Sequence, residues 1–353
     1  MSRFWSQIVH ELSPYVAGEQ PKFGNLIKLN TNENPYGPSP LVLKAIAAET
    51  TDSLRLYPDP TALQLRATIA RSYGLDESNV FVGNGSDEVL AHTFQALLKH
   101  DAPLLFPDIT YSFYPTYCRL YGIDFDEIAL DDIMSVRTSD YRRNCGAIIL
   151  PNPNAPTGTA LPLSEIEKLL IEHPDQVVVI DEAYVDFGAE SAIPLVRNYP
   201  NLLVVQTLSK SRGLAGLRVG FAVGESSLIE ALNRVKDSFN SYPLDRLAIV
   251  GAIAAWQDTV WFEESRNNIM ATRNRLALSM RGLGFEVLPS SANFLFVHHP
   301  ACSAKEIFTQ LRTKAILVRH LPGERTNDYL RISIGTDSEC AKLISALQTI
   351  LGS

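Results

Sequence analysis

The chain has 353 residues, of which 46% are hydrophobic and 20% charged, and its net charge at pH 7 is −8. These proportions are typical of folded globular proteins and exclude a disordered chain, a coiled coil and a collagen-like fibre. The balance of 31 Lys and Arg against 39 Asp and Glu disfavours an extended nucleic-acid surface, which needs clustered cations. It leaves room for a small anionic ligand held by two or three arginines.

The longest uncharged apolar run, residues 247–256, is too short to cross a bilayer. No apolar segment typical of a secretory signal is present near the N-terminus. The histidines and cysteines lack the spacing of metal ligands, so we expect no metal site. We predict a cytoplasmic protein without nucleic-acid or membrane partners. Its four scattered cysteines should be free thiols: Cys118, Cys145, Cys302 and Cys340.

The first thirty residues are expected to form an arm or a short helix, followed by a Pro- and Asn-rich loop at residues 30–40. Helices are predicted at residues 41–49 and 63–73. Farther along, short apolar runs alternate with helical segments such as residues 86–100 and 163–173. This alternation predicts an α/β fold with a mostly parallel central sheet covered by helices. The predicted strands are residues 80–82, 104–106, 147–150, 177–180, 202–206 and 219–223.

After residue 224 the pattern changes. Residues 245–282 contain almost no Gly or Pro and predict long helices. Strand-like segments then alternate with a helix at residues 304–312 and a closing helix from Asp337, which indicates a smaller α+β domain. We therefore expect an N-terminal arm (1–40) packing with the small domain, a large ligand-binding domain (41–258) and a small C-terminal domain (259–353).

Two residues with reactive side chains directly follow predicted strands. Asp181 comes after an apolar run, at the sheet edge where α/β proteins bind ligands, although it could equally cap the next segment. Lys210 also follows a strand, between hydroxyl residues and a glycine-rich stretch. A buried lysine at such a place can act as a nucleophile towards carbonyl groups, whereas most lysines are simply exposed. Arg218, eight residues on, suits a phosphate.

Two loops that follow other predicted strands add further candidate residues. Gly85, Ser86 and Asp87 open a predicted helix and offer backbone N–H groups to an anion, or form a plain turn with a cap. Glu88 stands where a dinucleotide-binding loop has its third glycine, which argues against a nicotinamide-dependent oxidoreductase. In the second loop, residues 151–158, three prolines either fix an asparagine amide beside a ligand or stiffen a surface connection.

Together these segments resemble the fold-type I pyridoxal-phosphate aminotransferases. The matching segments are GNGSDE, PNPNAPTG, DEAYVDF, TLSKSRGLAGLRVGF and LRISIGT. The opening segment NTNENPYGPSP and the later RLYPDP resemble the subfamily that transfers the amino group of L-histidinol phosphate to 2-oxoglutarate. The resemblance covers roughly residues 12–350. It implies a large domain with a mostly parallel sheet, a small domain, and a homodimer with a shared active site.

The resemblance also assigns roles around pyridoxal 5′-phosphate. Lys210 would form the Schiff base and move a proton, and Asp181 would hold the pyridine nitrogen protonated. Tyr184 and Asn154 would hydrogen-bond the phenolic oxygen, although many relatives have a second Asn where this chain has Ala155. Tyr111 would stack on the ring, or be an ordinary packed aromatic residue. The phosphate would be held by Gly85, Ser86, Asp87, Thr207, Ser209 and Arg218.

A second set of residues would hold the substrate. Arg331 lies within an otherwise apolar strand pattern and needs an anionic partner, which the resemblance identifies as the substrate carboxylate. Arg319, Tyr15 and Asn34 would complete the substrate site. Tyr57 would reach the cofactor from the neighbouring subunit, although a tyrosine in such a loop is often an ordinary aromatic residue.

The sequence leaves three alternatives open. An aromatic-amino-acid aminotransferase or a threonine-phosphate decarboxylase would share the same cofactor-binding residues. A cofactor-binding regulatory module fused to a DNA-binding domain is disfavoured, because the segment before residue 79 already resembles the enzyme family, whereas a DNA-binding domain would need a separate basic segment there.

Overall fold

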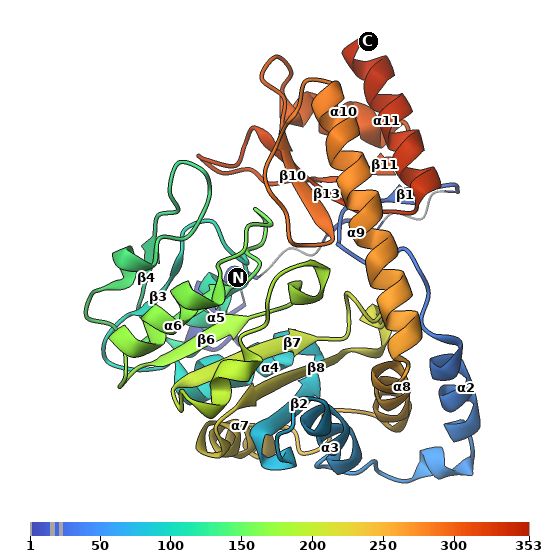
Figure 1. The fold of residues 1–353 in the computed structure, drawn as a ribbon. Helices are drawn as coiled ribbons and strands as arrows, with labels where there is room; N and C mark the ends of the chain where they lie inside the picture. Colours follow the sequence, from blue (N-terminus) through green and yellow to red (C-terminus); the bar gives the residue numbers. More distant parts are fainter. Residues whose placement is uncertain (1, 15–17, 21–23, 353) are drawn as a thin grey trace.

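The computed structural model describes residues 2–14, 18–20 and 24–352. Its main feature is a seven-stranded sheet with the strand order β2-β8-β7-β6-β5-β3-β4 (Figure 1). The strands from β3 to β7 run parallel, and β8 is antiparallel to both of its neighbours. The mostly parallel sheet predicted from sequence is therefore confirmed. The strands are β2 (Val80–Asn84), β3 (Leu104–Pro107), β4 (Phe125–Ile128), β5 (Ala147–Pro151), β6 (Val177–Asp181), β7 (Leu202–Thr207) and β8 (Val219–Gly224).

Sequence analysis missed one strand of this sheet, β4. Its residues Asp126 and Glu127 are exposed, because β4 lies at the edge of the sheet and pairs only with β3. The predicted strands are the ones buried on both faces, where almost every residue must be apolar. An edge strand tolerates charged side chains, and these also protect its unpaired edge from association.

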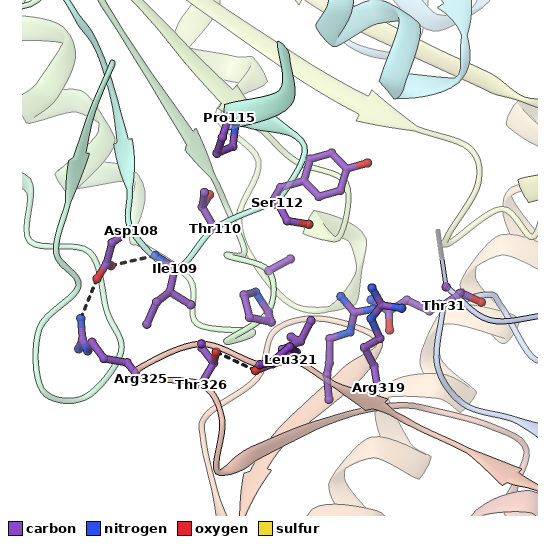
Figure 2. A pocket seen from close by; sticks show the side chains of 18 of the residues that line it. Thr31, Asp108, Ile109, Thr110, Ser112, Pro115, Arg319, Leu321, Arg325 and Thr326 are labelled. Carbon is purple, nitrogen blue, oxygen red and sulfur yellow. Dashed lines mark hydrogen bonds and ion pairs between the residues drawn. The ribbon is translucent and has the colours of Figure 1, made fainter. Parts of the chain in front are cut away.

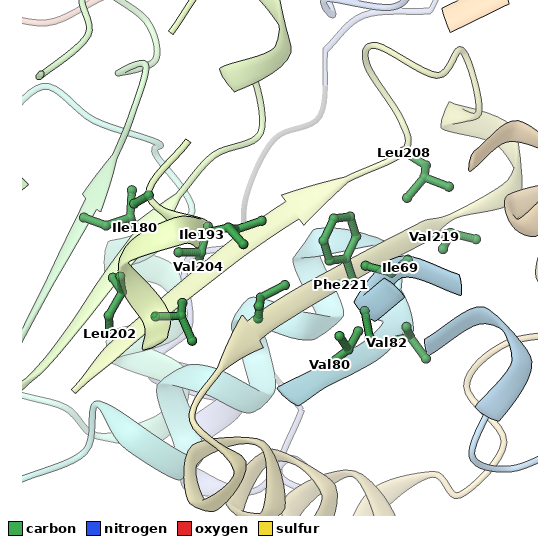
Figure 3. Close-up of a cluster of buried hydrophobic side chains, with 14 of the residues drawn as sticks. Ile69, Val80, Val82, Ile180, Ile193, Leu202, Val204, Leu208, Val219 and Phe221 are labelled. Atoms are coloured by element: carbon green, nitrogen blue, oxygen red, sulfur yellow. The ribbon is translucent and has the colours of Figure 1, made fainter. Parts of the chain in front are cut away.

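Helices cover both faces of the large sheet, and the side chains of its strands alternate between two cores. Val178 and Ile180 of β6 face one core, and Val179 between them faces the other. Figure 3 shows the first core, where Ile69 lies among Val80, Val82 and Phe221. Its helices are α3 (Leu63–Ser72), α6 (Leu163–Glu172) and α8 (Arg246–Gln257), and those of the second core are α4 (Gly85–Leu97), α5 (Tyr114–Tyr121) and α7 (Ser226–Phe239).

The C-terminal part forms a separate core around a four-stranded antiparallel sheet of order β12-β13-β10-β9. Its long first helix α9 runs from the end of α8 up to this sheet (Figure 1). The strands are β9 (Glu286–Val287), β10 (Phe294–His298), β12 (Arg319–His320) and β13 (Tyr329–Ser333). The helices are α9 (Thr259–Gly282), α10 (Ala304–Thr313) and α11 (Asp337–Leu351).

The N-terminal segment joins this C-terminal part. Strand β1 (Ile27–Lys28) pairs in parallel with β11 (Ile316–Leu317), and the amide of Ser333 donates to the carbonyl of Leu29 at 3.0 Å. Residues 30–39 then lead past the end of the large sheet to α2 (Pro40–Glu49), which packs on α8. The short helix α1 (Gln7–Glu11) precedes this segment. No helix among the described residues is both long and apolar enough to cross a membrane.

Candidate active site

The carboxyl ends of β5, β6 and β7 meet at one edge of the large sheet, and a cavity of about 130 Å³ lies there. We call it the inner cavity. Asp181 is the last residue of β6 and Thr207 the last of β7, so parallel pairing alone brings these two residues to the same edge. The lining residues are Ser86, Asp87, Tyr111, Pro151, Pro153, Ala155, Asp181, Ala183, Tyr184, Thr207, Ser209, Lys210 and Arg218.

One end of the inner cavity is built to receive an anion. Helix α4 begins at Gly85 directly after β2, and its N-cap residue Asn84 makes no side-chain capping bond, which leaves N–H groups of the first turn available to an anion. Ser86 and Asp87 of this turn line the cavity. Arg218 lies across this helix start. A Cβ on Gly85 would sit 2.3 Å from Nη2 of Arg218, so only glycine leaves space for the guanidinium group. Gly85 also has a φ of +79°, which favours glycine.

Asp87 connects this anion site to an aromatic ring. Its Oδ2 accepts a hydrogen bond from Nη2 of Arg218 at 2.9 Å, and its Oδ1 accepts from the hydroxyl of Tyr111 at 2.8 Å. A further bond, 3.4 Å long, runs from Nη1 of Arg218 to the hydroxyl of Ser209. The Asp87 carboxylate is therefore neutralised by Arg218, and it fixes the Tyr111 ring at the cavity wall.

The Asp181 carboxylate also lines the inner cavity and is buried. The hydroxyl of Tyr114 donates to its Oδ2 at 2.9 Å, and the amide of Ala183 donates to its Oδ1 at 3.3 Å. Burial raises the pKa of Asp181 from 3.8 to about 6, because desolvation penalises the charged form. A buried carboxylate of this kind is stabilised by a positively charged partner.

Lys210 and Tyr184 lie between the inner cavity and a second, larger one, and they line both. Nζ of Lys210 donates to the carbonyl of Thr31 at 3.1 Å and lies 5.8 Å from the centre of the Tyr184 ring. The Tyr184 hydroxyl accepts a hydrogen bond from the side-chain amide nitrogen of Asn32 at 3.0 Å. An amine and a phenol thus stand side by side where the two cavities join.

The loop of residues 151–158 differs from the sequence expectation in one respect. Ala155 lines both cavities, whereas Asn154 lines neither. The Asn154 amide nitrogen donates to the carbonyl of Ile109 and to the hydroxyl of Thr157, at 3.0 and 3.1 Å. The bonds Asn152–Pro153 and Ala155–Pro156 are cis. At the cavity wall this loop therefore presents a methyl group in place of an amide.

The second cavity, which we call the outer cavity, has a volume of about 630 Å³. Figure 2 shows side chains from residues 108–115 on one side and from residues 319–326 on the other, with Thr31 at one end. The first segment follows β3 of the large sheet, the second begins with β12 of the C-terminal sheet, and Thr31 belongs to the N-terminal segment. The outer cavity is thus formed between parts of the molecule that are distant in sequence.

Two arginines on neighbouring strands line the outer cavity. Arg319 of β12 pairs directly with Arg331 of β13, so both side chains lie on the same face of the sheet. Nη2 of Arg331 donates to the carbonyl of Asn30 at 3.1 Å, and its guanidinium lies 5.5 Å from the centre of the Phe294 ring. Two like charges directly across a strand pair repel each other, and an anion placed between them removes that repulsion.

An ion pair crosses the mouth of the outer cavity. Nη1 of Arg325 lies 3.1 Å from Oδ2 of Asp108, which directly follows β3 (Figure 2). The same guanidinium donates to the carbonyls of Leu130 and Asp131 at 3.0 and 2.8 Å. Sequence analysis missed this contact, because 217 positions separate its two partners and neither lies in a recognisable motif.

Besides Asn154, three further predicted residues lie away from both cavities or outside the described part of the chain. Asn34 donates to the carbonyl of Ser211 and the hydroxyl of Ser265, at 3.0 and 3.2 Å, and lines neither cavity. Tyr57 is 78% exposed and stacks on Tyr242, with ring centres 4.7 Å apart. Tyr15 lies outside the described residues.

Comparison with known proteins identifies the family. Residues 24–347 match the family model for aminotransferases of class I and II. The chain belongs to this aminotransferase family. It is 62% identical over 355 residues to a histidinol-phosphate aminotransferase of Aromatoleum aromaticum, a match that covers 99% of this chain and 100% of the relative. It is 63% identical over 351 residues to the enzyme of that name from Gluconacetobacter diazotrophicus, covering 99% of each chain.

Solved aminotransferase structures share the fold. The crystal structure of histidinol-phosphate aminotransferase from Sinorhizobium meliloti in complex with pyridoxal-5′-phosphate superposes with a TM-score of 0.89 at 24% identity. The alignment covers 100% of this chain and 98% of that one. At this identity the likeness concerns the fold, and it confirms the fold-type I architecture expected from the sequence.

Pyridoxal phosphate is the cofactor of this aminotransferase family, and the inner cavity fits it. The absence of a Cβ at Gly85 leaves a cradle where helix α4 and Arg218 offer donors to a phosphate. The buried Asp181 suits a protonated ring nitrogen. Tyr111 and Lys210 line the same cavity and offer an aromatic ring and an amine.

Proposed function

We propose that this aminotransferase transfers the amino group of L-histidinol phosphate to 2-oxoglutarate, giving imidazole acetol phosphate and L-glutamate, a step of histidine biosynthesis. The observation that carries the proposal is the pair Arg319 and Arg331 beside Lys210 in the outer cavity. One substrate carries a phosphate and the other carboxylates. Each guanidinium group can bind a carboxylate or a phosphate through two parallel hydrogen bonds, so the pair suits either anion. The names of the full-length relatives support the same reaction.

The proposed cofactor site follows from the contacts of the inner cavity. Gly85, Ser86 and Asp87 at the start of α4, with Thr207, Ser209 and Arg218, would hold the phosphate, and Tyr111 would cover the ring. When bound, pyridoxal phosphate supplies a carbonyl carbon that receives the amino group and a ring that accepts electrons from the substrate carbon. Asp181 would keep a proton on the ring nitrogen, which strengthens that electron acceptance.

Lys210 would carry the proton transfer. Its Nζ lies where both cavities join, within reach of a ligand in either. We propose that it holds the cofactor as a Schiff-base lysine in the resting enzyme and, once replaced by the substrate amine, takes the proton from the substrate carbon. The Tyr184 hydroxyl would donate a hydrogen bond to the phenolic oxygen. Asn154 stays a proposed partner of the same oxygen, although in this structure its amide nitrogen donates to the carbonyl of Ile109.

A homodimer with a shared active site is part of the proposal. Several large apolar side chains within residues 41–63, the stretch that contains Tyr57, are about half exposed or more, and a contiguous apolar surface is typical of protein interfaces. They are Leu41, Leu43, Leu54, Leu56 and Leu63. Tyr57 would then reach the cofactor of the partner subunit, and Tyr15 and Asn34 remain proposed contributors to substrate binding.

We further propose the domain division 1–40, 41–258 and 259–353, with the arm packing on the small domain through the pairing of β1 and β11. A cytoplasmic location is proposed because the four cysteines are free thiols, which suits a reducing compartment.

One assay tests the proposed reaction. Purified protein loaded with pyridoxal phosphate is mixed with 2-oxoglutarate and, in turn, with L-histidinol phosphate, phenylalanine, tyrosine and threonine phosphate, and the release of glutamate and of carbon dioxide is measured. We expect L-histidinol phosphate to give the highest kcat/KM. Turnover with phenylalanine or tyrosine alone would contradict the proposed substrate and leave an aromatic-amino-acid aminotransferase, and decarboxylation of threonine phosphate would contradict it equally.

A further inference from the structure

Asn32 occupies a position that none of the assigned roles explains. It is 1% exposed and adopts a φ of +57°, a left-handed conformation that asparagine tolerates better than most residues. Its backbone is fixed on the C-terminal part of the molecule. The backbone N–H of Asn32 donates to the hydroxyl of Ser333 at 2.9 Å, and the backbone carbonyl of Asn32 accepts from the side chain of Asn293 at 2.9 Å.

The hydrogen bonds around Asn32 determine which way each donor points. The Ser333 hydroxyl oxygen accepts from the Asn32 backbone amide, and its own hydrogen is donated to Oδ1 of the Asn32 side chain at 2.8 Å. Oδ1 is thereby the acceptor of the side-chain amide, so Nδ2 faces Tyr184. An amide nitrogen only donates. The Tyr184 oxygen must therefore accept, and its hydrogen points to another acceptor.

That acceptor position lies in the cavities, because Tyr184 lines both of them. The residue at the neighbouring wall is Ala155, whose methyl group supplies no hydrogen bond. Thr31, next to Asn32, accepts a hydrogen bond from Lys210, so this short segment contacts the amine as well as the phenol. Hydrogen bonds in such a chain polarise one another and strengthen the last donor.

We infer that Asn32 is a positioning residue, which orients the Tyr184 hydroxyl as a donor to the phenolic oxygen of the bound cofactor, and that Ser333 fixes the Asn32 amide for this task. The inference rests on the proposed cofactor site. Through Ser333 of β13, the C-terminal sheet would thus influence the electronic state of a cofactor that is held by the large sheet.

The test is the pH midpoint of the visible absorption band of the purified holoenzyme. Asn32→Asp replaces the donor by an acceptor of the same shape, so the Tyr184 hydrogen turns away from the cavity. We expect the midpoint to rise by about one pH unit, because a hydrogen bond to the deprotonated form is lost. We expect kcat to fall roughly tenfold with little change in the KM for L-histidinol phosphate.

A double-mutant cycle separates positioning from a structural role. In the Tyr184→Phe background, the shift caused by Asn32→Asp should shrink to what the added negative charge alone produces, because the group that it orients is gone. The matched control Asn293→Ala removes the bond to the Asn32 carbonyl and should leave the midpoint as in the wild type. A shift of the same size in the Phe background, or in the control, would overturn the inference.

Ser333→Ala is a second variant that tests the role of Asn32, in case Asn32→Asp does not fold. Without the Ser333 hydroxyl the Asn32 amide is free to rotate, and we expect the midpoint to rise by about half as much. An unchanged midpoint in Ser333→Ala, with intact folding by circular dichroism, would count against the inference. Failure of the proposed substrate is a separate result: a holoenzyme that has the visible band but ignores L-histidinol phosphate still reports on Asn32.

Discussion

The inner and outer cavities adjoin each other but are built in different ways. The inner cavity takes its side chains from the ends of neighbouring strands in one sheet, and each strand end is a short stretch of sequence. The outer cavity takes them from the N-terminal segment, the loop after β3 and the C-terminal sheet. We therefore expect variants of the inner cavity to change cofactor binding, and variants of the two arginines of the outer cavity to change substrate binding alone.

Loss of the Lys210 amine should have the largest effect. Lys210→Ala removes the group that we propose both anchors the cofactor and moves the proton, and we expect kcat to fall roughly 10⁴-fold. Borohydride treatment followed by peptide mass spectrometry should attach the cofactor to Lys210 in the wild type. Lys342→Ala, an exposed lysine of α11, is the control and should retain activity. Full transamination by Lys210→Ala would contradict the proposed mechanism.

Asp181→Asn should separate activity from stability. We expect kcat to fall about 10²- to 10³-fold, because the proton on the ring nitrogen is no longer held. The cofactor-free variant should be more stable than the wild type above pH 6. A rise in the pKa from 3.8 to about 6 corresponds to about 3 kcal/mol of destabilisation of the charged form.

The sign of this effect follows from proton binding. Between pH 3.8 and about 6, folded wild-type protein retains a proton on Asp181 that the unfolded chain has released, so its free energy of unfolding falls as the pH rises. The side-chain amide of the Asp181→Asn variant does not titrate. Burial also raises the pKa of Glu182, to about 7, but this contribution cancels between the two proteins. Urea unfolding of both proteins from pH 4.5 to 7.5 measures the difference between their free energies of unfolding. A difference that does not change with pH would show that the titration of Asp181 is not its cause.

The arginine pair should give an intermediate effect confined to substrate binding. Arg331→Gln should lower kcat/KM about 10²-fold for both L-histidinol phosphate and 2-oxoglutarate, because both anions use the pair. The visible spectrum and the Kd for pyridoxal phosphate should stay as in the wild type. Loss of activity towards only one substrate would show that the two anions bind at different places.

Removal of the ion pair at the cavity mouth should have the smallest effect. Arg325 and Asp108 are partly exposed, so the pair is screened by solvent and salt. Arg325→Ala should raise the KM for L-histidinol phosphate about two- to fivefold at low salt, and less at high salt. Asp108→Asn should behave alike, and the double variant should add little to either. Additive effects would mean that the two residues act separately.

The contrast between the cavities also explains what could be predicted from sequence. Strands such as β6 were predicted because burial on both faces makes them continuous apolar runs, and the polar residue that ends each run marks the inner cavity. Asp181 and Lys210 were found in this way, and Arg218 was found from its place eight residues after Lys210. Tyr114 was not, because its contact with Asp181 is made across the sheet edge and its sequence neighbourhood is merely aromatic.

The outer cavity was predicted only where the family resemblance supplied the residues. Arg319 and Arg331 line it as expected, whereas Asn34 bonds to Ser211 and Ser265 instead. Asn32, two positions earlier, contacts Tyr184, and no local pattern distinguishes these two asparagines. Their roles depend on the chain direction after β1, which is fixed by pairing with β11 almost three hundred residues away.

The central claim is that one site, formed where the two cavities join, accepts both anionic substrates in turn. The most direct measurement is a half-reaction: holoenzyme is mixed with L-histidinol phosphate alone and its visible band is followed. We predict that the band bleaches without 2-oxoglutarate, and that 2-oxoglutarate then restores it with release of one equivalent of glutamate per site. A band that bleaches with phenylalanine but is unchanged by L-histidinol phosphate would contradict the account.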